Sequence, residues 1–197
     1  MKTKNIIVAA MMAMTTIITT NLCQAQIKMG VRGGLNASNI SFKNLPERSE
    51  KFGYHIGLFA DVPIVPSFFS LQPEVSFSTK GTEFEYLGDK KSLSMNSVDL
   101  FLPIAFKLST VDLSVGPFVS YLINKPVFTQ YSDNSIVMNG FKKMDAGLTA
   151  GLAFNFSKML LGFRYKQGLM DVTNDNLRAV IGSGKNAVAQ VSLGYKF

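Results

Sequence analysis

Val191-Ser192-Leu193-Gly194-Tyr195-Lys196-Phe197 closes the chain, and in it large apolar residues alternate with small or polar ones. An alternation with a period of two gives a β-strand two unlike faces, one apolar and one polar. The same alternation recurs along the chain from Ile27 onward. In an exported bacterial protein, this pattern ending on an aromatic residue is typical of the last strand of an outer-membrane β-barrel.

The amino terminus has the features of an export signal. Lys2 and Lys4 precede an apolar run over residues 6–18, and Cys23-Gln24-Ala25 places small residues where a signal peptidase cleaves. We therefore expect residues 1–25 to be a signal peptide that directs export through the Sec pathway and is removed.

The only cysteine, Cys23, lies in this segment. A lipoprotein would require small residues just before Cys23, where Thr20-Asn21-Leu22 stand. Cleavage after Ala25, which removes Cys23 with the signal peptide, is therefore the favoured interpretation. Residues 26–197 are then expected to form one outer-membrane β-barrel domain. Without its cysteine, that domain has no disulfide, thiolate metal site or cysteine nucleophile.

The charge and hydropathy patterns argue against a nucleic-acid-binding protein and against a protein that spans the membrane with helices. Of the 20 Lys and Arg residues, two lie in the predicted signal peptide, so 18 remain against 13 Asp and Glu. This excess is scattered with no basic run, so no nucleic-acid partner is expected. After the signal peptide the longest apolar run covers residues 100–106, far short of the ~18 residues of a spanning helix.

The alternation predicts eight strands of about 10 to 14 residues, the length that a tilted strand needs to cross a bilayer. These strands are 27–38, 52–62, 68–81, 98–108, 111–122, 144–156, 159–172 and 186–197. Short connections (63–67, 109–110, 157–158) alternate strictly with long ones (39–51, 82–97, 123–143, 173–185). The fold class predicted is all-β, an eight-stranded antiparallel up-and-down transmembrane β-barrel with short periplasmic turns and long extracellular loops.

The two faces of the predicted strands decide between a membrane barrel and a soluble one. A soluble, lipocalin-like barrel places its apolar residues inside, where they must fill a core. Here the apolar face is uniformly large, and the opposite face is interpreted as a lumen lined by charges and glycines. The glycines assigned to it are Gly33, Gly34, Gly57, Gly116, Gly147, Gly151 and Gly162. Because proline removes a ladder hydrogen bond, bulges are expected near Pro103 and Pro117.

Stretches spread over the whole chain carry a family resemblance. They are residues 30–36 (GVRGGLN), 71–75 (LQPEV), 80–81 (KG), 102–104 (LPI), 116–122 (GPFVSYL), 145–148 (DAGL), 164–165 (RY), 168–169 (GL) and 194–197 (GYKF). In these the chain resembles the PorT-like outer-membrane β-barrel family common in Bacteroidetes. The resemblance implies the fold and the location. It implies no shared catalytic residue, and the secretion role that the family name suggests does not carry over.

No constellation of catalytic, cofactor-binding or metal-ligating residues is visible. His55 is the only histidine, and its neighbours on the same strand face are Gly53 and Gly57 rather than a serine, so an outer-leaflet lipid hydrolase is a weaker interpretation than a structural histidine. Gly182-Ser183-Gly184-Lys185 departs from a phosphate-binding loop because the next residue is Asn186 and the lysine leads into a strand. We expect no enzymatic activity, no cofactor and no metal site.

The inward-facing charges are predicted to lie in three layers. Buried charges must pair or stay hydrated, so a salt-bridged plug is favoured over a proton or ion path. The central layer is an interior charge cluster of Arg32, Glu74 and Arg164. The outer layer holds His55, Lys80, Asp99, Asp145 and Lys166. The periplasmic layer holds Lys28, Asp61, Lys107, Asp112 and Lys196.

The extracellular hairpin between strands three and four continues to alternate, with Glu83-Phe84-Glu85-Tyr86 expected to face Leu93-Ser94-Met95-Asn96. An open strand edge there would recruit another chain by strand addition, and Phe128 and Tyr131 in the next loop add aromatic surface. The sequence thus favours a monomeric barrel that contacts outer-membrane lipid and acts through its loops in interaction, adhesion, envelope integrity or as an accessory to a larger complex. A narrow porin-like channel and a lipid-modifying enzyme remain as alternatives.

The end of the chain has a second predicted role. Tyr195 and Phe197 are expected to face lipid at the periplasmic rim, where aromatic rings lie between hydrocarbon and water. Their spacing from the carboxyl terminus resembles the signal read by the barrel-insertion machinery, which is the expected partner during assembly.

Overall fold

The computed structural model describes residues 27–42, 49–86, 89–124, 127–130, 135–137, 142–171 and 184–197. The predicted signal peptide and Tyr131 lie outside these residues. Within the described part, no helix is long and apolar enough to cross a membrane. The regular elements are β1 (Lys28–Phe42), β2 (Ser49–Val65), β3 (Phe69–Leu71), β4 (Glu74–Tyr86), β5 (Asp89–Phe101), β6 (Ile104–Leu108), β7 (Val111–Leu122), β8 (Val127–Gln130), β9 (Ser135–Val137), β10 (Met144–Phe156), β11 (Met159–Gly168) and β12 (Gly184–Lys196).

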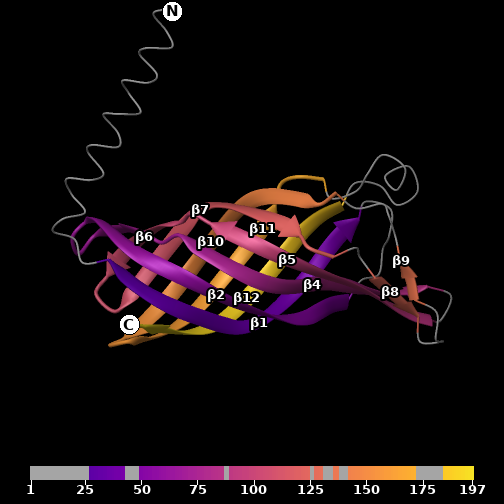
Figure 1. Cartoon of the computed structure of the whole chain (residues 1–197), viewed down its shortest axis with the longest axis horizontal. Coiled ribbons are helices and arrows are strands. Elements are labelled where there is room, and N and C mark those ends of the chain that lie inside the picture. The colour runs from indigo at the N-terminus through magenta and orange to yellow at the C-terminus, as the bar shows by residue number, and fades with distance from the viewer. Residues whose placement is uncertain are drawn as a thin grey trace, which may run out of the picture.

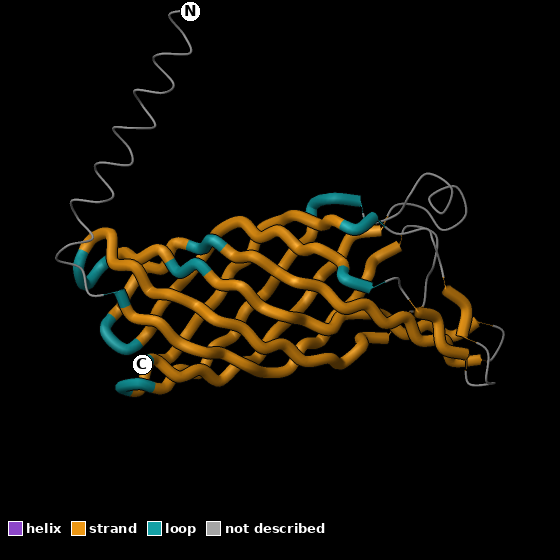
Figure 2. The backbone as a smooth tube through the Cα atoms, in the orientation of Figure 1, coloured by secondary structure: helices purple, strands orange, loops and turns teal. Residues whose placement is uncertain are grey.

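These strands form one antiparallel sheet that closes on itself, and the strands are strongly tilted (Figures 1 and 2). The ring runs β1, β2, β3 with β4, β5 with β6, β7, β10, β11 and β12, and β12 pairs with β1 from Gly30↔Lys196 to Phe42↔Gly184. Because β3 and β4 make one barrel strand, and β5 and β6 make another, the predicted eight-stranded up-and-down barrel is confirmed.

Two prolines divide barrel strands without shifting their register. β3 and β4 are separated by Gln72 and Pro73, and β5 and β6 by Leu102 and Pro103. The carbonyl of each proline still accepts a backbone bond, from Ala60 N to Pro73 O and from Gln72 N to Pro103 O, both 2.9 Å.

The expected bulges near Pro103 and Pro117 are wrong. β7 runs unbroken through Pro117, and its pairing with β5 and β6 keeps one register across Pro103. The register shifts instead on β2, between Pro63 and Val65 and between Glu50 and His55. The missing N–H of each proline therefore costs one hydrogen bond of the strand pairing, but no extra residue is inserted as a β-bulge.

The distribution of side chains is inverted relative to a soluble protein. Large apolar residues such as Leu58, Val75 and Leu148 are more than half exposed on the outer wall, while charged and hydroxyl side chains are buried in the lumen. Gly33, which was expected in the lumen, instead shares the outer face with Val31, because both lie at odd positions of β1. A Cβ at Gly33 would meet nothing closer than 3.5 Å.

The two ends of the barrel differ. One end, here called the turn end, carries tight turns in which Ser67, Ser109 and Ser157 adopt positive φ angles of 68°, 55° and 56°, and the carboxyl terminus lies there too (Figure 1). The opposite end, the loop end, carries β8 and β9 (Figure 1).

At the loop end the β4–β5 hairpin continues well beyond the other strands (Figure 2). Its register pairs Glu83 with Ser92 and Tyr86 with Asp89, so residues 83–86 face 89–92 rather than the expected 93–96. The outer edge of β5 is not open, since residues 91–94 pair with β8, which in turn pairs with β9. The predicted long loop over residues 123–143 thus contains two short strands.

A charge on the outer wall should destabilise the barrel according to its depth. Leu58 lies midway along β2 and is 62% exposed, so Leu58→Arg should cost about 2 to 4 kcal/mol of unfolding free energy in lipid vesicles. Ile64→Arg, close to the turn end of the same strand, should cost about 0 to 1 kcal/mol. Denaturant titration of both variants in vesicles checks the pair, and equal costs would contradict the assignment of the outer wall to lipid.

Two glycines on opposite faces provide a matched test of the register. A Cβ at Gly147 would lie 2.0 Å from the carbonyl oxygen of Gln167, whereas one at Gly33 would lie at an ordinary contact distance of 3.5 Å from the carbonyl oxygen of His55. Gly147→Ala should therefore lose about 1 to 3 kcal/mol through overpacking, and Gly33→Ala should change stability by less than about 1 kcal/mol. Unfolding midpoints of the two variants in the same vesicles test this prediction. If Gly33→Ala were the more destabilising of the two, the faces would be misassigned.

Candidate functional site

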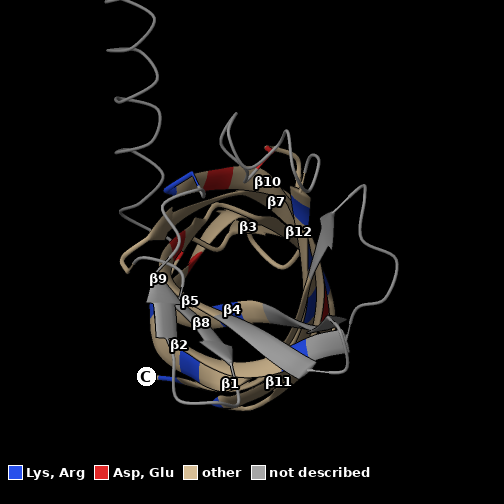
Figure 3. Cartoon of the chain, turned by 90° about the vertical axis from the view of Figure 1, so that its right-hand side faces the viewer, with Lys and Arg blue, Asp and Glu red and all other residues tan. Residues whose placement is uncertain are grey.

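The lumen holds the candidate site, because the polar side chains converge there. Charged positions lie on strands all around the ring (Figure 3). Inward-facing positions follow from strand parity, so each strand contributes every second residue to the lumen. The contacts between these residues form two ionic clusters at different depths.

The first group, the glutamate cluster, consists of Arg32 of β1, Glu74 at the start of β4 and Arg164 of β11. Arg164 holds Glu74 with two bonds, Nη1 to Oε1 at 3.0 Å and Nη2 to Oε2 at 2.6 Å. Arg32 Nη1 contacts Oε2 at 3.2 Å. The structure thus brings together all three residues that the sequence placed at one depth. A bidentate arginine fixes the carboxylate in orientation as well as in position.

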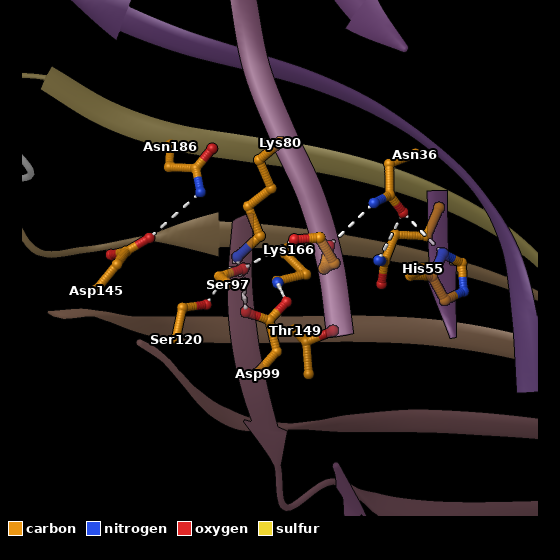
Figure 4. A network of polar contacts seen from close by, with 12 residues as sticks. Asn36, His55, Lys80, Ser97, Asp99, Ser120, Asp145, Thr149, Lys166 and Asn186 are labelled. Carbon is orange, nitrogen blue, oxygen red and sulfur yellow. Dashed lines mark hydrogen bonds and ion pairs between the residues drawn. The ribbon is translucent and has the colours of Figure 1, made fainter. Parts of the chain in front are cut away.

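The second group, the aspartate cluster, is centred on Asp99 of β5. Lys80 Nζ lies 2.8 Å from Oδ1 and Lys166 Nζ lies 2.5 Å from Oδ2 (Figure 4). Ser97 Oγ donates to Oδ1 at 2.9 Å, and Lys80 Nζ also bonds Ser120 Oγ at 2.9 Å. Each cluster therefore has the same composition, one carboxylate between two cations.

Inward aromatic rings support both clusters. Arg32 lies over Phe59 and Arg164 over Phe101, with guanidinium carbons 4.8 and 4.3 Å from the ring centres. Lys166 Nζ is 4.9 Å from the centre of Phe101 and 4.7 Å from that of Phe118. A desolvated cation over a ring face is stabilised by the ring quadrupole. These rings offset part of the unfavourable charge burial.

The other two residues assigned to the outer layer do not join the aspartate cluster. His55 Nδ1 lies 2.7 Å from Asn36 Oδ1, in a separate network in which Asn36 also bonds Ser78 and Gln190 (Figure 4). Asp145 is approached only by Asn186, Nδ2 to Oδ2, at 3.4 Å among the described contacts. Distance along a strand misplaces such residues because the strands are tilted and staggered around the ring.

The layer at the turn end is only partly formed. Lys107 Nζ pairs with Asp61 Oδ2 at 2.7 Å, while Lys196 Nζ donates to Asn155 Oδ1 at 2.6 Å rather than to a carboxylate. Asp112 receives a long 3.4 Å bond from Gln72, and Lys28 is exposed. This layer is therefore looser than the two clusters above it.

Sequence reasoning missed the lumen-facing aromatic residues Phe59, Phe101 and Phe118. It placed Asn36 on the polar face of its strand but did not predict its contact with His55. A signal for Phe101 was present, since it falls between Leu100 and Leu102 and so takes the polar face of its strand. Its size hid that parity, because large apolar residues were assigned to lipid throughout.

The architecture and the sequence match a known family of outer-membrane proteins. The model of the family described as outer membrane protein β-barrel domain matches residues 23–174. The chain belongs to this outer-membrane barrel family. No match is found among curated proteins.

Several solved structures share the fold of this outer-membrane barrel, and two of them are matched over nearly their whole length. One is Ail, the attachment invasion locus protein of Yersinia pestis, in complex with the heparin analogue sucrose octasulfate. It is 13% identical with a TM-score of 0.50, over 87% of this chain and 99% of that one. The other is Neisserial surface protein A, 9% identical with a TM-score of 0.54, over 86% of this chain and 97% of that one. At such identities the likeness is one of fold alone.

The family sets the orientation of the barrel in the outer membrane. Barrels of this class have short turns in the periplasm and longer loops outside. The turn end is accordingly periplasmic and the loop end extracellular. At the turn end Tyr195 and Phe197 are exposed, with ring centres 6.1 Å apart, and Lys158 Nζ lies 5.8 Å from the Tyr195 ring.

The glutamate cluster should respond unequally to loss of its members. Glu74→Gln leaves two buried arginines without a counter-charge, which typically costs about 3 to 5 kcal/mol, less where water enters the lumen. Arg164→Gln should be milder because Arg32 still balances the carboxylate, and Arg32→Gln the mildest because Arg32 makes a single contact with Glu74. Unfolding in lipid vesicles measures the series.

Ser76→Ala is the control for this series. Ser76 faces the lumen on the same strand as Glu74, and its Oγ has no hydrogen-bond partner in the structure. It should therefore be close to neutral. A destabilisation by Glu74→Gln no larger than that of Ser76→Ala would mean that the cluster contributes nothing.

The carboxyl-terminal aromatic residue should matter for assembly. Deleting Phe197 removes the last rim ring and the backbone bond from its nitrogen to Met29 O at 2.9 Å, and should reduce the heat-modifiable folded band in outer membranes. Phe197→Ala separates the two causes, since it retains that bond. Phe68→Ala, an exposed ring at the same end, serves as the control; normal folded yield after the deletion would count against an assembly signal.

Proposed function

We propose that this outer-membrane barrel is non-conducting and acts through its extracellular part, in adhesion or another interaction, in envelope integrity, or as an accessory subunit of a larger complex. The proposal rests on one observation. Side chains cross the lumen at two depths, while the sheet continues past the barrel at the loop end.

The lumen supports a plug rather than a pore. The side chains of Glu74 and Asp99 are 1% and 0% exposed, and Phe101 and Phe118 are buried beside them. Eight strands enclose only enough space for side chains, so two clusters joined to rings occupy much of the cross-section. Ions passing through would have to displace paired charges, which are costly to separate.

The extracellular part supports an interaction role. Beyond the rim, β4, β5, β8 and β9 form a small sheet, and the start of β2 pairs with β4 at Ser49↔Glu83. Such a scaffold holds its strands at fixed positions above the membrane. Because β8 covers the edge of β5, we infer that a partner contacts the faces or tip of this sheet rather than adding a strand to β5.

We further propose that the protein is monomeric, exported through Sec, a member of the PorT-like branch and without enzymatic activity. The sequence stretches quoted above support the branch, and the amino-terminal pattern supports the export route. Against catalysis, His55 is 2% exposed and bonded to Asn36, so it is not presented to a substrate.

Site-specific photocrosslinking in intact outer membranes tests the interaction role. A photoreactive residue replaces Tyr86 at the tip of the hairpin, and a matched one replaces Leu58 on the lipid-facing wall. A discrete crosslinked macromolecule at position 86 that is absent at position 58 supports the proposal. Identical patterns at the two positions would contradict it.

Planar-bilayer recordings test the plug. The parent protein should show only background conductance, and Glu74→Gln should lower stability without opening a path. Stable conductance in the parent, with an ion selectivity that Glu74→Gln alters, would support the channel instead. Unchanged lipid A mass in a deletion strain is the expected result for a protein that modifies no lipid.

A further inference from the structure

Asp145 and Asn186 form a polar pair, separate from both ionic clusters, at the extracellular mouth of the lumen. They come from β10 and β12, the two neighbours of β11, and point toward one another (Figure 4). Asp145 is 5% exposed and Asn186 7%. Their single contact, Nδ2 to Oδ2 at 3.4 Å, is close to the limit of a hydrogen bond.

The pair leaves two buried oxygens without a partner. Asp145 Oδ1 and Asn186 Oδ1 both lack a hydrogen-bond donor. The two lysines of the aspartate cluster are both held by Asp99, and no ion pair of Asp145 is found among the described residues. A buried carboxylate without a direct ion-pair partner is unfavourable, so a cation in contact with Asp145 would stabilise it.

The backbone at Gly168 brings oxygen atoms close together. Between the two strands lies Gly168 of β11, where a Cβ would come within 2.9 Å of both Asp145 carboxylate oxygens and 3.1 Å of the backbone oxygen of Asn186. Any other residue would fill this space. Three oxygen atoms therefore converge on the Cβ side of Gly168, where only a residue without a side chain fits.

The donor atoms are all oxygens, which selects a hard cation. A carboxylate, an amide oxygen and a backbone carbonyl are typical Ca²⁺ ligands, with water completing the shell. The Asn186 amide can turn so that Oδ1 replaces Nδ2 opposite Asp145, which sacrifices only the long 3.4 Å bond. Mg²⁺ requires a more regular octahedron, so the irregular set fits Ca²⁺ better.

We propose that Asp145 and Asn186, beside Gly168, bind a partly hydrated Ca²⁺ ion at the extracellular mouth of the lumen. The ion supplies the direct cationic contact that Asp145 lacks and ties β10 to β12 across β11. This site is independent of the proposed function, since it requires neither a plug nor a partner.

Calcium titration of the full folded chain tests the site. Protein folded in phosphatidylcholine vesicles and stripped with EDTA is titrated with CaCl₂ and, separately, MgCl₂ in a calorimeter. The parent should bind Ca²⁺ with a dissociation constant of about 10⁻⁴ to 10⁻³ M, the range of extracellular calcium modules. Asp145→Asn removes the one charged ligand and should weaken binding by at least about tenfold, since even loss of a group that only orients a metal ligand typically costs that much.

Two further variants keep the test decisive. Asn186→Asp adds a second carboxylate and should tighten Ca²⁺ binding and raise the unfolding temperature in Ca²⁺ relative to EDTA, even if Asp145→Asn fails to fold. Asp112→Asn removes a buried carboxylate at the opposite end of the lumen and should titrate like the parent. The proposal is overturned if the parent binds no Ca²⁺ at about 10 mM, if folded Asp145→Asn titrates like the parent, or if Asn186→Asp gains nothing.

Discussion

Pairing of every backbone hydrogen-bonding group is the constraint on which the rest of this structure depends. Hydrocarbon offers no partner for a free N–H or C=O, so a sheet that spans the membrane must close. The thirteen residue pairs between β1 and β12 provide that closure. Once the ring is closed, the outward face must be apolar and the inward face must hold the remaining polar side chains. Even Pro73 and Pro103 are accommodated by keeping the register and losing only their own donors.

The lumen solves the problem that closure creates. A narrow interior filled with charges would be unstable if the charges were unpaired, and hydration is limited by space. The protein instead surrounds each of two carboxylates, Glu74 and Asp99, with two cations, and supports the cations with aromatic rings. The surplus positive charge of this arrangement is a reason for further carboxylates, such as Asp145, to lie in the same lumen. The contacts that stabilise the lumen are thus the ones on which the proposed plug depends.

The sequence predicted the barrel because alternation with a period of two is enforced along every strand by lipid on one side and a polar lumen on the other. It also predicted the contact of Arg32, Glu74 and Arg164, whose positions along their strands are similar. It misplaced His55 and Asp145 because strand tilt and stagger change relative depth around the ring, and stagger depends on pairing between strands that one strand's pattern does not contain. Gly33 was placed in the lumen on residue type, and Phe101 was not singled out as a lumen residue, although parity places both correctly. Pairing of β8 with β5 is a tertiary contact with no comparable local signal.

Phe101 has a position that links the two clusters. Its ring lies beneath Arg164 of the glutamate cluster and Lys166 of the aspartate cluster, which are two residues apart on β11. Interactions that share a partner are not additive, so the energies of the two clusters are coupled through one ring. A change in either cluster alters what the other can tolerate. Replacements inside the lumen are therefore expected to be accepted in concerted sets rather than one residue at a time.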